Sequence, residues 1–287
     1  MTPKTKPVTA QPKPLDAWNG SADAPVPSCC SPERRTRASA LLSPPEPLRK
    51  LIVNADDFGL SQGTNQGIAI AHERGIVTSA SLMVRGPAAT EAAQYARGHP
   101  SLSVGLHVDL CEWTFSGGAW RPVYQVVPTQ DAEAVASEVA RQLTAFRELV
   151  GRVPTHLDSH QHVHREEPTR SILLQTARDL GIVLRGEADR VRHCGDFYGQ
   201  SDKGYPFQEA ISVASLCRLL RNLPPGITEL GCHPGQDGNL DSMYNSERQI
   251  ECQTLCDPAV AETLRAEGII LTNWHSDGLF LPATIEN

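Results

Sequence analysis

Short apolar runs alternate with longer amphipathic segments along most of the chain, from about residue 47 onward. Each run holds three to six mostly apolar residues and is bounded by polar residues, Gly or Pro, a pattern typical of buried strands. The predicted strands lie at residues 51–55, 79–84, 104–108, 155–158, 182–184, 228–232 and 269–273.

The segments between these runs have the apolar spacing of helices. The longest of them carries an apolar residue every three or four positions and is followed by Gly151, a typical helix terminator. Another begins at Pro168, a favoured first position, and ends before Gly181. The predicted helices span residues 66–74, 132–150 and 168–180.

Strands that alternate with helices over about 240 residues predict a parallel sheet, because parallel neighbours need a crossover connection between them. Such a sheet is either open or closed into a barrel. We therefore expect an α/β fold, with a single domain that occupies residues 47–287.

The beginning of the chain has a different composition. Ten of the 22 prolines precede residue 48, and the same stretch has few large apolar residues and no periodicity. Such a segment cannot bury enough apolar surface to offset the entropy that it would lose on ordering. Residues 1–46 are therefore predicted to be a disordered, proline-rich extension.

The composition argues against several classes of protein. A chain of 287 residues that is 40% hydrophobic and 21% charged is typical of globular proteins, and a net charge of −7 argues against nucleic-acid binding. No apolar run approaches the roughly 18 residues of a membrane span, and residues 1–20 lack the apolar core of a signal peptide, so we expect a cytoplasmic protein. The eight cysteines match neither a disulfide scaffold nor a zinc ribbon. A homodimer is compatible with the sequence, which does not determine the oligomeric state.

Polar side chains suited to chemistry follow the ends of most predicted strands. In a parallel barrel the carboxyl ends of the strands form one face, where barrel enzymes place their active sites. One such residue would mean little, whereas several that converge on one face predict a site. These residues are Asp56, Asp57, His107, Asp158, His160, Arg185, His233, His275 and Asp277.

Each of these residues also has a structural interpretation. His107 alone could be a core histidine with satisfied hydrogen bonds, and the adjacent acidic pair could belong to a helix-capping turn. The histidines between residues 156 and 164 alternate along the chain, and they cannot all bind one ion. Some of His156, His162 and His164 must therefore contact the ligands or face the solvent.

Two histidines and one carboxylate form a recurrent site for zinc or another divalent ion, with positions left open for water and substrate. An ion in such a site lowers the pKa of bound water from about 15.7 to about 7. A neighbouring carboxylate can then serve as the base, and a further histidine can protonate the leaving group.

Five segments of the chain carry a specific combination of motifs. They are Asn54-Ala-Asp-Asp-Phe-Gly59, Gly75-Ile-Val-Thr-Ser-Ala-Ser-Leu-Met83, Gly105-Leu-His107, Thr155-His-Leu-Asp-Ser-His-Gln-His-Val-His164 and Cys232-His-Pro234. Together they resemble the YdjC-like carbohydrate deacetylases, which include ChbG-type chitooligosaccharide deacetylases and a hopanoid-associated branch. The resemblance covers roughly residues 50–280, and it implies a modified (β/α) TIM-like barrel that removes N-acetyl groups from amino sugars.

The resemblance also implies roles for individual residues. By position, Asp57, His107 and His160 would hold one divalent ion, either magnesium or zinc. Asp56 would be the catalytic base, and His233, in the late His-Pro motif, is the candidate acid.

Two further residues are candidates for binding a small carbohydrate. Arg185 matches a basic residue that follows a strand in the family. Trp113 lies in residues 112–120, an aromatic segment that looks particular to this chain. Its rings could stack on the faces of pyranose sugars, or they could pack at the rim of the barrel.

Two other functions remain as alternatives. The motif Asp158-Ser-His-Gln-His162 suggests a PHP-type metallophosphoesterase, although its place in the middle of the chain disfavours that class. The second alternative is a carbohydrate-binding protein without catalysis, which the presence of every candidate ligand disfavours. The sequence leaves the natural sugar and the metal undetermined.

Overall fold

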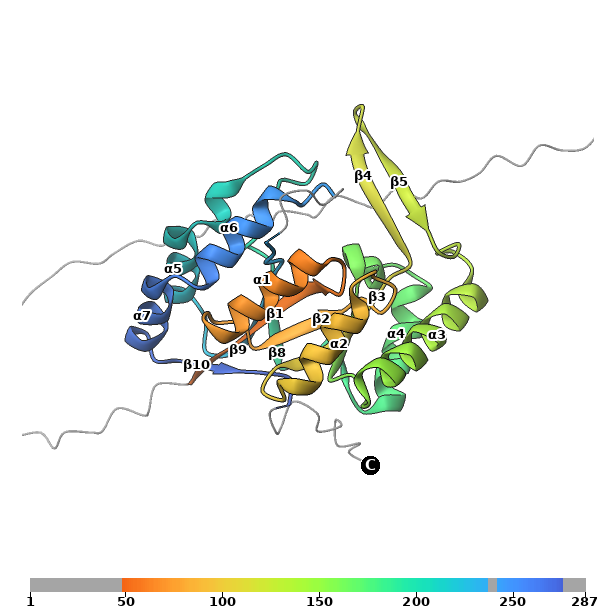
Figure 1. The fold of residues 1–287 in the computed structure, drawn as a ribbon, viewed down its shortest axis with the longest axis horizontal. Coiled ribbons are helices and arrows are strands. Elements are labelled where there is room, and N and C mark those ends of the chain that lie inside the picture. The colour runs from red at the N-terminus through yellow and green to blue at the C-terminus, as the bar shows by residue number, and fades with distance from the viewer. Residues whose placement is uncertain (1–47, 237–241, 276–287) are drawn as a thin grey trace, which may run out of the picture. The chain divides into compact units, whose positions relative to one another are not determined.

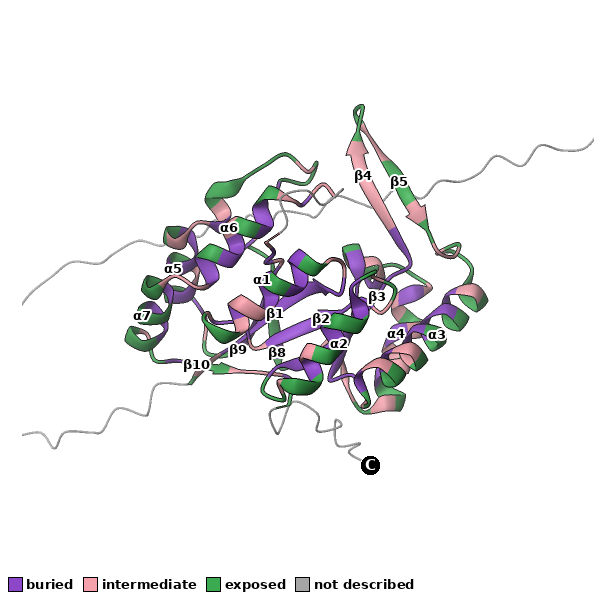
Figure 2. Ribbon diagram, viewed as in Figure 1, coloured by how far each residue is buried: buried purple, intermediate pink, exposed green. Residues whose placement is uncertain are grey.

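The ten-residue strand β1 (Arg49–Phe58) lies at the centre of the sheet. In the computed structural model, which describes residues 48–236 and 242–275, β9 (Gly226–Cys232) pairs along one edge of β1. On the other edge, β10 (Ile269–Thr272) pairs with the first half of β1 and β2 (Ser79–Leu82) pairs with the second half. Neighbours on both edges and helices outside bury most of β1, which explains its run of apolar residues (Figure 2).

The remaining barrel strands are β3 (Ser103–Val108), β6 (His156–Ser159), β7 (Val183–Leu184) and β8 (Val191–Cys194). The pairing order is β7-β6-β3-β2-β1-β9-β8, and every pair is parallel. The strands at the two ends of this order, β7 and β8, are joined by residues 185–190 alone, so the sheet has to curl. It forms a half-barrel flanked by helices, which confirms the predicted α/β fold and is consistent with a modified TIM-like barrel.

Within the described ranges, seven α-helices accompany the strands (Figure 1): α1 (Gln62–Glu73), α2 (Ala89–Gly98), α3 (Ala132–Val150), α4 (Thr169–Leu180), α5 (Val213–Arg221), α6 (Ser246–Leu255) and α7 (Pro258–Ala266). The prediction for α3 is confirmed at both ends, because the Asp131 side chain caps its first turn and Gly151 follows with a φ of 79°. The predicted helix at 66–74 begins earlier, since Ser61 accepts the backbone N–H of Thr64 and caps α1.

The helices α2, α5, α6 and α7 were not predicted from the sequence, and neither were two features of the strands. One is β8, and the other is an antiparallel hairpin of β4 (Cys111–Ser116) and β5 (Ala119–Gln125) that projects beyond the barrel (Figure 1). The hairpin turn consists of Gly117 and Gly118, whose φ values of 60° and 79° suit the tight turns that join twisted strands. The aromatic segment at 112–120 therefore forms most of a hairpin.

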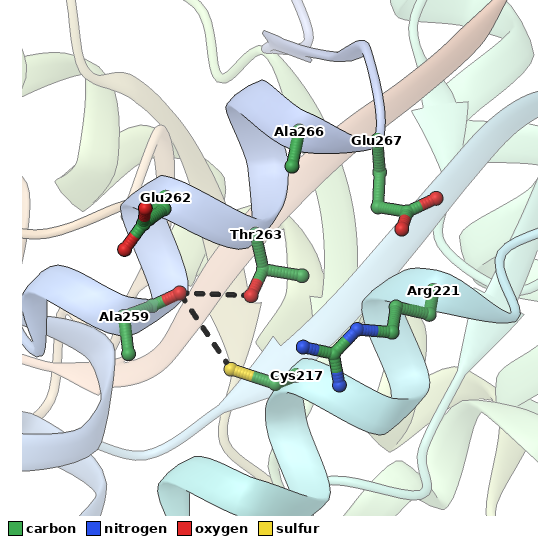
Figure 3. A pocket seen from close by; sticks show the side chains of 7 residues that line it. All are labelled: Cys217, Arg221, Ala259, Glu262, Thr263, Ala266 and Glu267. Atoms are coloured by element: carbon green, nitrogen blue, oxygen red, sulfur yellow. Dashed lines mark hydrogen bonds between the residues drawn. The ribbon is translucent and has the colours of Figure 1, made fainter.

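A cavity of about 200 Å³ is lined by residues of α5 and α7 and by Glu267 (Figure 3). The Cys217 thiol and the Thr263 hydroxyl on its wall both donate to the Ala259 carbonyl oxygen, so these polar groups have partners within the wall. None of the residues predicted to carry chemistry lines this cavity. Among the described residues, no helix has the length and apolar character that crossing a bilayer requires. The predicted extension, residues 1–46, lies outside the described residues.

Candidate active site

The backbone turns sharply where β1 ends. Asp57 has a φ of +65°, which is uncommon for a residue with a side chain and is found most often where function requires it. Side chains of a regular strand alternate between faces, whereas this bend lets the neighbouring carboxylates of Asp56 and Asp57 both face residues at the barrel mouth. Gly59 completes the turn with a φ of +97°, and a side chain there would lie 2.9 Å from the Met83 carbonyl oxygen.

The three predicted metal ligands come together at this point. Asp57 Oδ1 lies 3.0 Å from His160 Nδ1 and 3.4 Å from His107 Nε2. His107 reaches the cluster from β3, and His160 reaches it from the turn that follows β6. Each of the three residues offers one ligand atom, and these atoms lie within 4.8 Å of one another, as ligands of one cation must.

Asp158 orients His107. The Nδ1 of His107 donates to Asp158 Oδ1 over 2.8 Å, since an ionised carboxylate can only accept, and Nε2 is left facing Asp57. Carboxylates hold metal-ligating histidines in the same way. Burial lowers the pKa of His107, but the contacts with Asp158 and Asp57 outweigh it and raise that pKa well above its usual value. The negative field that holds a proton on this imidazole would also hold a metal ion.

A second group, Asp56, His107 and Asp158, also has the spacing of a metal site. Its two carboxylates already have a cation, because Nη1 of Arg185 donates to Asp158 and, over 2.6 Å, to Asp56 Oδ1. Arg185 thus occupies both carboxylates of this group, whereas Arg248 occupies only Oδ2 of Asp57 and leaves Oδ1 facing the two histidines. The cluster around Asp57 is therefore the better candidate.

Arg185, expected to contact substrate, lies inside the barrel and is 3% exposed. Its Nη2 donates to Glu229 Oε1 over 2.7 Å, in addition to the bonds with Asp56 and Asp158. Burial raises the pKa of Glu229, but Arg185 and His193 outweigh burial and lower it to about 2. The structure thus places Arg185 against the candidate base, and a direct contact with sugar stays a prediction.

One carboxylate oxygen of Asp56 accepts hydrogen bonds, and the other faces the candidate acid, His233. Oδ1 accepts from Asn54 Nδ2 over 2.8 Å and from Arg185, whereas Oδ2 lies 3.8 Å from Nε2 of His233. His233 follows β9, and burial lowers the pKa of its imidazole to about 4. The predicted base and the predicted acid are therefore neighbours, beside the predicted metal ligands.

The other histidines of the long motif lie outside both clusters. His156 Nε2 lies 3.0 Å from the Ser81 hydroxyl inside the barrel, and His164 Nδ1 lies 2.8 Å from the Ser159 hydroxyl. His162 has a φ of +55°, and its ring centroid is 5.8 Å from that of His164.

Trp113 is tied to the metal-ligand turn through its backbone. Its N–H donates to Gln161 Oε1 over 2.8 Å, and its carbonyl oxygen accepts from Gln161 Nε2 over 2.9 Å. Contact of the half-buried Trp113 ring with a sugar stays a prediction. His275 is exposed beyond β10, whose pairing reaches only Ile52 of β1, and Asp277 lies outside the described residues.

Three charged residues of the site were missed by the sequence analysis: Glu229, Arg248 and Glu251. Arg248 Nη2 donates to Asp57 Oδ2 over 2.6 Å. Glu229 interrupts an apolar run, and this was a usable signal, because a charge within a buried strand needs a partner. Arg248 and Glu251 belong to α6, and in the sequence they resemble the exposed charges of any surface helix.

The fold and this cluster define an α/β half-barrel protein with candidate metal-binding and acid–base residues at the carboxyl ends of its strands. The chain belongs to the YdjC-like family, since the family model described as YdjC-like protein matches residues 50–266.

Two solved structures are similar to this chain. A proposed cellobiose-phosphate cleavage protein from Enterococcus faecalis V583 is 26% identical with a TM-score of 0.62, and the match covers 79% of this chain and 98% of that one. The Bc1960 peptidoglycan N-acetylglucosamine deacetylase is 11% identical with a TM-score of 0.50, covering 78% of this chain and 85% of that one. The second likeness shows a shared fold alone.

Proposed function

We propose that this protein is a metal-dependent hydrolase that removes the N-acetyl group from an acetylated amino sugar, or from an oligosaccharide or glycoconjugate that contains one, and releases acetate. The observation that carries the proposal is that the site contains two groups of residues, candidate metal ligands and a pair suited to proton transfer. Asp57, His107 and His160 surround one point, and Asp56 faces His233 beside them. Membership of the YdjC-like family, which the sequence motifs link to carbohydrate deacetylases, supports it.

The formal charge of the site supports a divalent ion. One buried carboxyl group of the site, Glu251, favours its neutral form at neutral pH because burial raises its pKa to about 8. Four ionised, buried carboxylates lie beside two buried guanidinium groups, so two negative charges remain when the histidines are neutral. Uncompensated buried charges are costly, and one divalent cation, zinc or magnesium, would balance them. Bound there, such an ion would polarise the amide carbonyl. The charged residues are Asp56, Asp57, Asp158 and Glu229 with Arg185 and Arg248.

The remaining groups supply proton transfer. Asp56 Oδ2 accepts the proton of the attacking water, while Arg185 on Oδ1 holds this carboxylate in place. His233 Nε2 donates a proton to the amine nitrogen as the C–N bond breaks, because an amine leaves only when protonated. Hydrolysis of an amide therefore needs both groups, one to accept a proton and one to donate it.

The test is an assay of acetate and phosphate from the purified protein loaded separately with zinc and with magnesium. Substrates are N-acetylated sugars of increasing length and cellobiose phosphate, which the name of the Enterococcus relative suggests. We expect acetate from at least one N-acetylated sugar and none from the Asp56→Asn variant. Phosphate release without acetate would favour the phosphoesterase alternative, and sugar binding without turnover would favour the non-catalytic one.

A further inference from the structure

The buried side of α6 carries two ionisable side chains one turn apart, Arg248 and Glu251, which are 2% and 0% exposed. Burial of a charge is costly unless hydrogen bonds compensate it. Arg248 has its partner in Asp57, the predicted metal ligand. The proposed reaction assigns nothing to Glu251, although it lies at the same site.

Glu251 contacts His233 twice. Its Oε2 accepts the backbone N–H of His233, and its Oε1 lies 3.9 Å from His233 Nδ1. The Tyr244 hydroxyl donates to Oε1 of Glu251 and accepts the backbone N–H of Gly199 over 2.8 Å. The Tyr244 carbonyl oxygen accepts a hydrogen bond from Arg248 Nε over 2.9 Å. Tyr244 therefore connects Glu251 with Arg248 through hydrogen bonds.

These contacts define the orientation of the His233 ring. Within the described part of the chain, Nδ1 is buried without a hydrogen-bond partner, and the nearby carboxyl oxygen of Glu251 is available to it. The rings of Tyr198 and Tyr244 lie 5.5 Å and 5.1 Å from the imidazole, centroid to centroid. With Nδ1 toward α6, Nε2 faces Asp56 Oδ2.

We propose that Glu251, held by Tyr244, is the positioning residue of His233: it fixes the backbone and Nδ1 of this histidine so that Nε2 faces the reacting amide. The catalytic part of this inference rests on the proposed function, whereas the orientation of the ring does not. Glu251 touches no reacting atom and acts through His233. The helix α6 would then support both halves of the site, the metal ligand through Arg248 and the acid through Glu251.

The protonation of the pair is compatible with this role. Burial raises the pKa of Glu251 to about 8 and lowers the pKa of His233 to about 4. Both groups therefore favour their neutral forms at neutral pH, so Glu251 has a carboxyl proton that it can pass to Nδ1 when Nε2 gives its own proton to the amine, once Oε1 and Nδ1 close from 3.9 Å to hydrogen-bond distance. A carboxyl group beside Nδ1 can thus stabilise the imidazole as Nε2 gives up its proton.

The first test is kinetic and uses the metal-loaded full-length protein with the N-acetylated sugar that releases acetate. Glu251→Gln keeps the size of the side chain but has no carboxyl proton to pass to Nδ1, so kcat should fall by about 10- to 100-fold with KM and metal content nearly unchanged. The loss should be smaller on an aryl acetate ester, whose leaving group needs no acid. Tyr244→Phe should show a smaller loss in the same direction, and it serves if Glu251→Gln does not fold.

Glu247→Gln is the matched control. Glu247 is also buried on α6, but it accepts from Gln200 Nε2 over 3.0 Å and from the Asn245 backbone N–H over 3.2 Å, outside the site. This variant should keep the kcat of the unaltered protein. An equal loss in both variants, or equal losses on amide and ester, would mean that Glu251 merely maintains the helix and would overturn the proposal.

The second test needs no activity. Long-range 1H–15N spectra of the histidine rings, with His233 assigned through His233→Asn, should show shifted His233 nitrogens in Glu251→Gln and unshifted ones in Glu247→Gln. Unchanged His233 signals in Glu251→Gln would overturn the positioning role whatever the kinetics. Shifted signals in a protein that releases acetate from no sugar would uphold the positioning and overturn the deacetylase proposal.

Discussion

At the scale of single residues, the carboxylates of Asp56 and Asp57 are neighbours in the chain but face different partners. Asp57 Oδ1 faces two histidine nitrogens, and its Oδ2 accepts from Arg248. Asp56 is held by Arg185 and faces His233. The bend at Asp57 brings both carboxylates to one site, because a regular strand would send the side chains to opposite faces.

Asparagine substitutions should separate these roles. Asp56→Asn keeps the shape of the side chain but cannot accept a proton, so turnover should disappear while metal content stays high. Asp57→Asn should lower both, because it weakens a ligand. Metal analysis by mass spectrometry, together with acetate release, measures the two effects. Equal metal loss in the two variants would refute the division.

His107→Ala should strip the ion at neutral pH, since two remaining protein ligands hold a divalent metal poorly. Metal content after dialysis measures the effect. His72→Ala is the control, because His72 on α1 contacts the Val77 carbonyl oxygen and the Ser101 hydroxyl, away from the cluster. Full metal occupancy in His107→Ala would show that the ligand set is wrong.

His156 should make the protein sensitive to acid. Burial lowers the pKa of its imidazole from 6.5 to about 3, so the unfolded chain binds a proton in this window that the folded protein does not. Stability should therefore fall as the pH drops from 6.5, by roughly 3 kcal/mol at about pH 4 from this residue. In His156→Gln, which can still bond Ser81, urea unfolding should depend less on pH over this range. Parallel pH profiles for both proteins would contradict the assignment.

Much of the site could be predicted from residues whose chemistry is evident in the sequence. The acidic pair after β1, the histidine of Gly105-Leu-His107 and the histidine before Pro234 each follow a strand, and the structure brings them together. Arg248 could not be predicted, because it meets Asp57 across 191 residues and nothing local marks it as buried. The roles given to these residues stay predictions until the substitutions are made.

At the scale of elements, predictions succeeded where local signals determine the structure. The helix at 132–150 has its own cap, stripe and terminating glycine, and α3 has those bounds. The hairpin β4–β5 was missed although the alternation of apolar and polar residues in β4 and the two glycines after it were usable signals. Its second strand, β5, is mostly exposed and contains Pro122, which is unusual within a strand. The four residues of β8 were missed because their run, Val-Arg-His-Cys, is mostly polar and gains its partner only from β9.

The hairpin should loosen when its link to the metal-ligand turn is removed. Gln161→Ala deletes both bonds to the Trp113 backbone, which join the hairpin to the residue beside His160. Amide hydrogen exchange should rise in residues 111–125 while the barrel strands stay protected, because local opening follows local bonding. Exchange that rises equally in β1 would show that the hairpin and the barrel open together.

At the scale of the whole molecule, curling of the sheet is what assembles the site. The contacts of Asp57 with His160 and Arg248 join residues 103 and 191 positions apart. The alternation of strands and helices predicts a parallel sheet, but it does not predict which strands pair. In the structure β10 pairs with β1, and β8 pairs with β9. The pairing order therefore had to come from the structure, and with it the convergence of strand ends that makes one site.

The extension at residues 1–46 is predicted to be dispensable for the barrel. This segment is rich in proline and has no periodic apolar face that could pack on the barrel. It also precedes the folded part of the chain, since β1 begins at Arg49 and the family match begins at residue 50. Deleting residues 1–45 leaves Leu48, whose carbonyl oxygen accepts the Gly226 N–H, so the first backbone bond of the sheet is kept. The melting temperature, measured by calorimetry, should change by less than about 2 °C, and acetate release should be retained. A larger fall in melting temperature would show that the extension packs on the barrel, and a loss of activity at constant stability would place it at the active site.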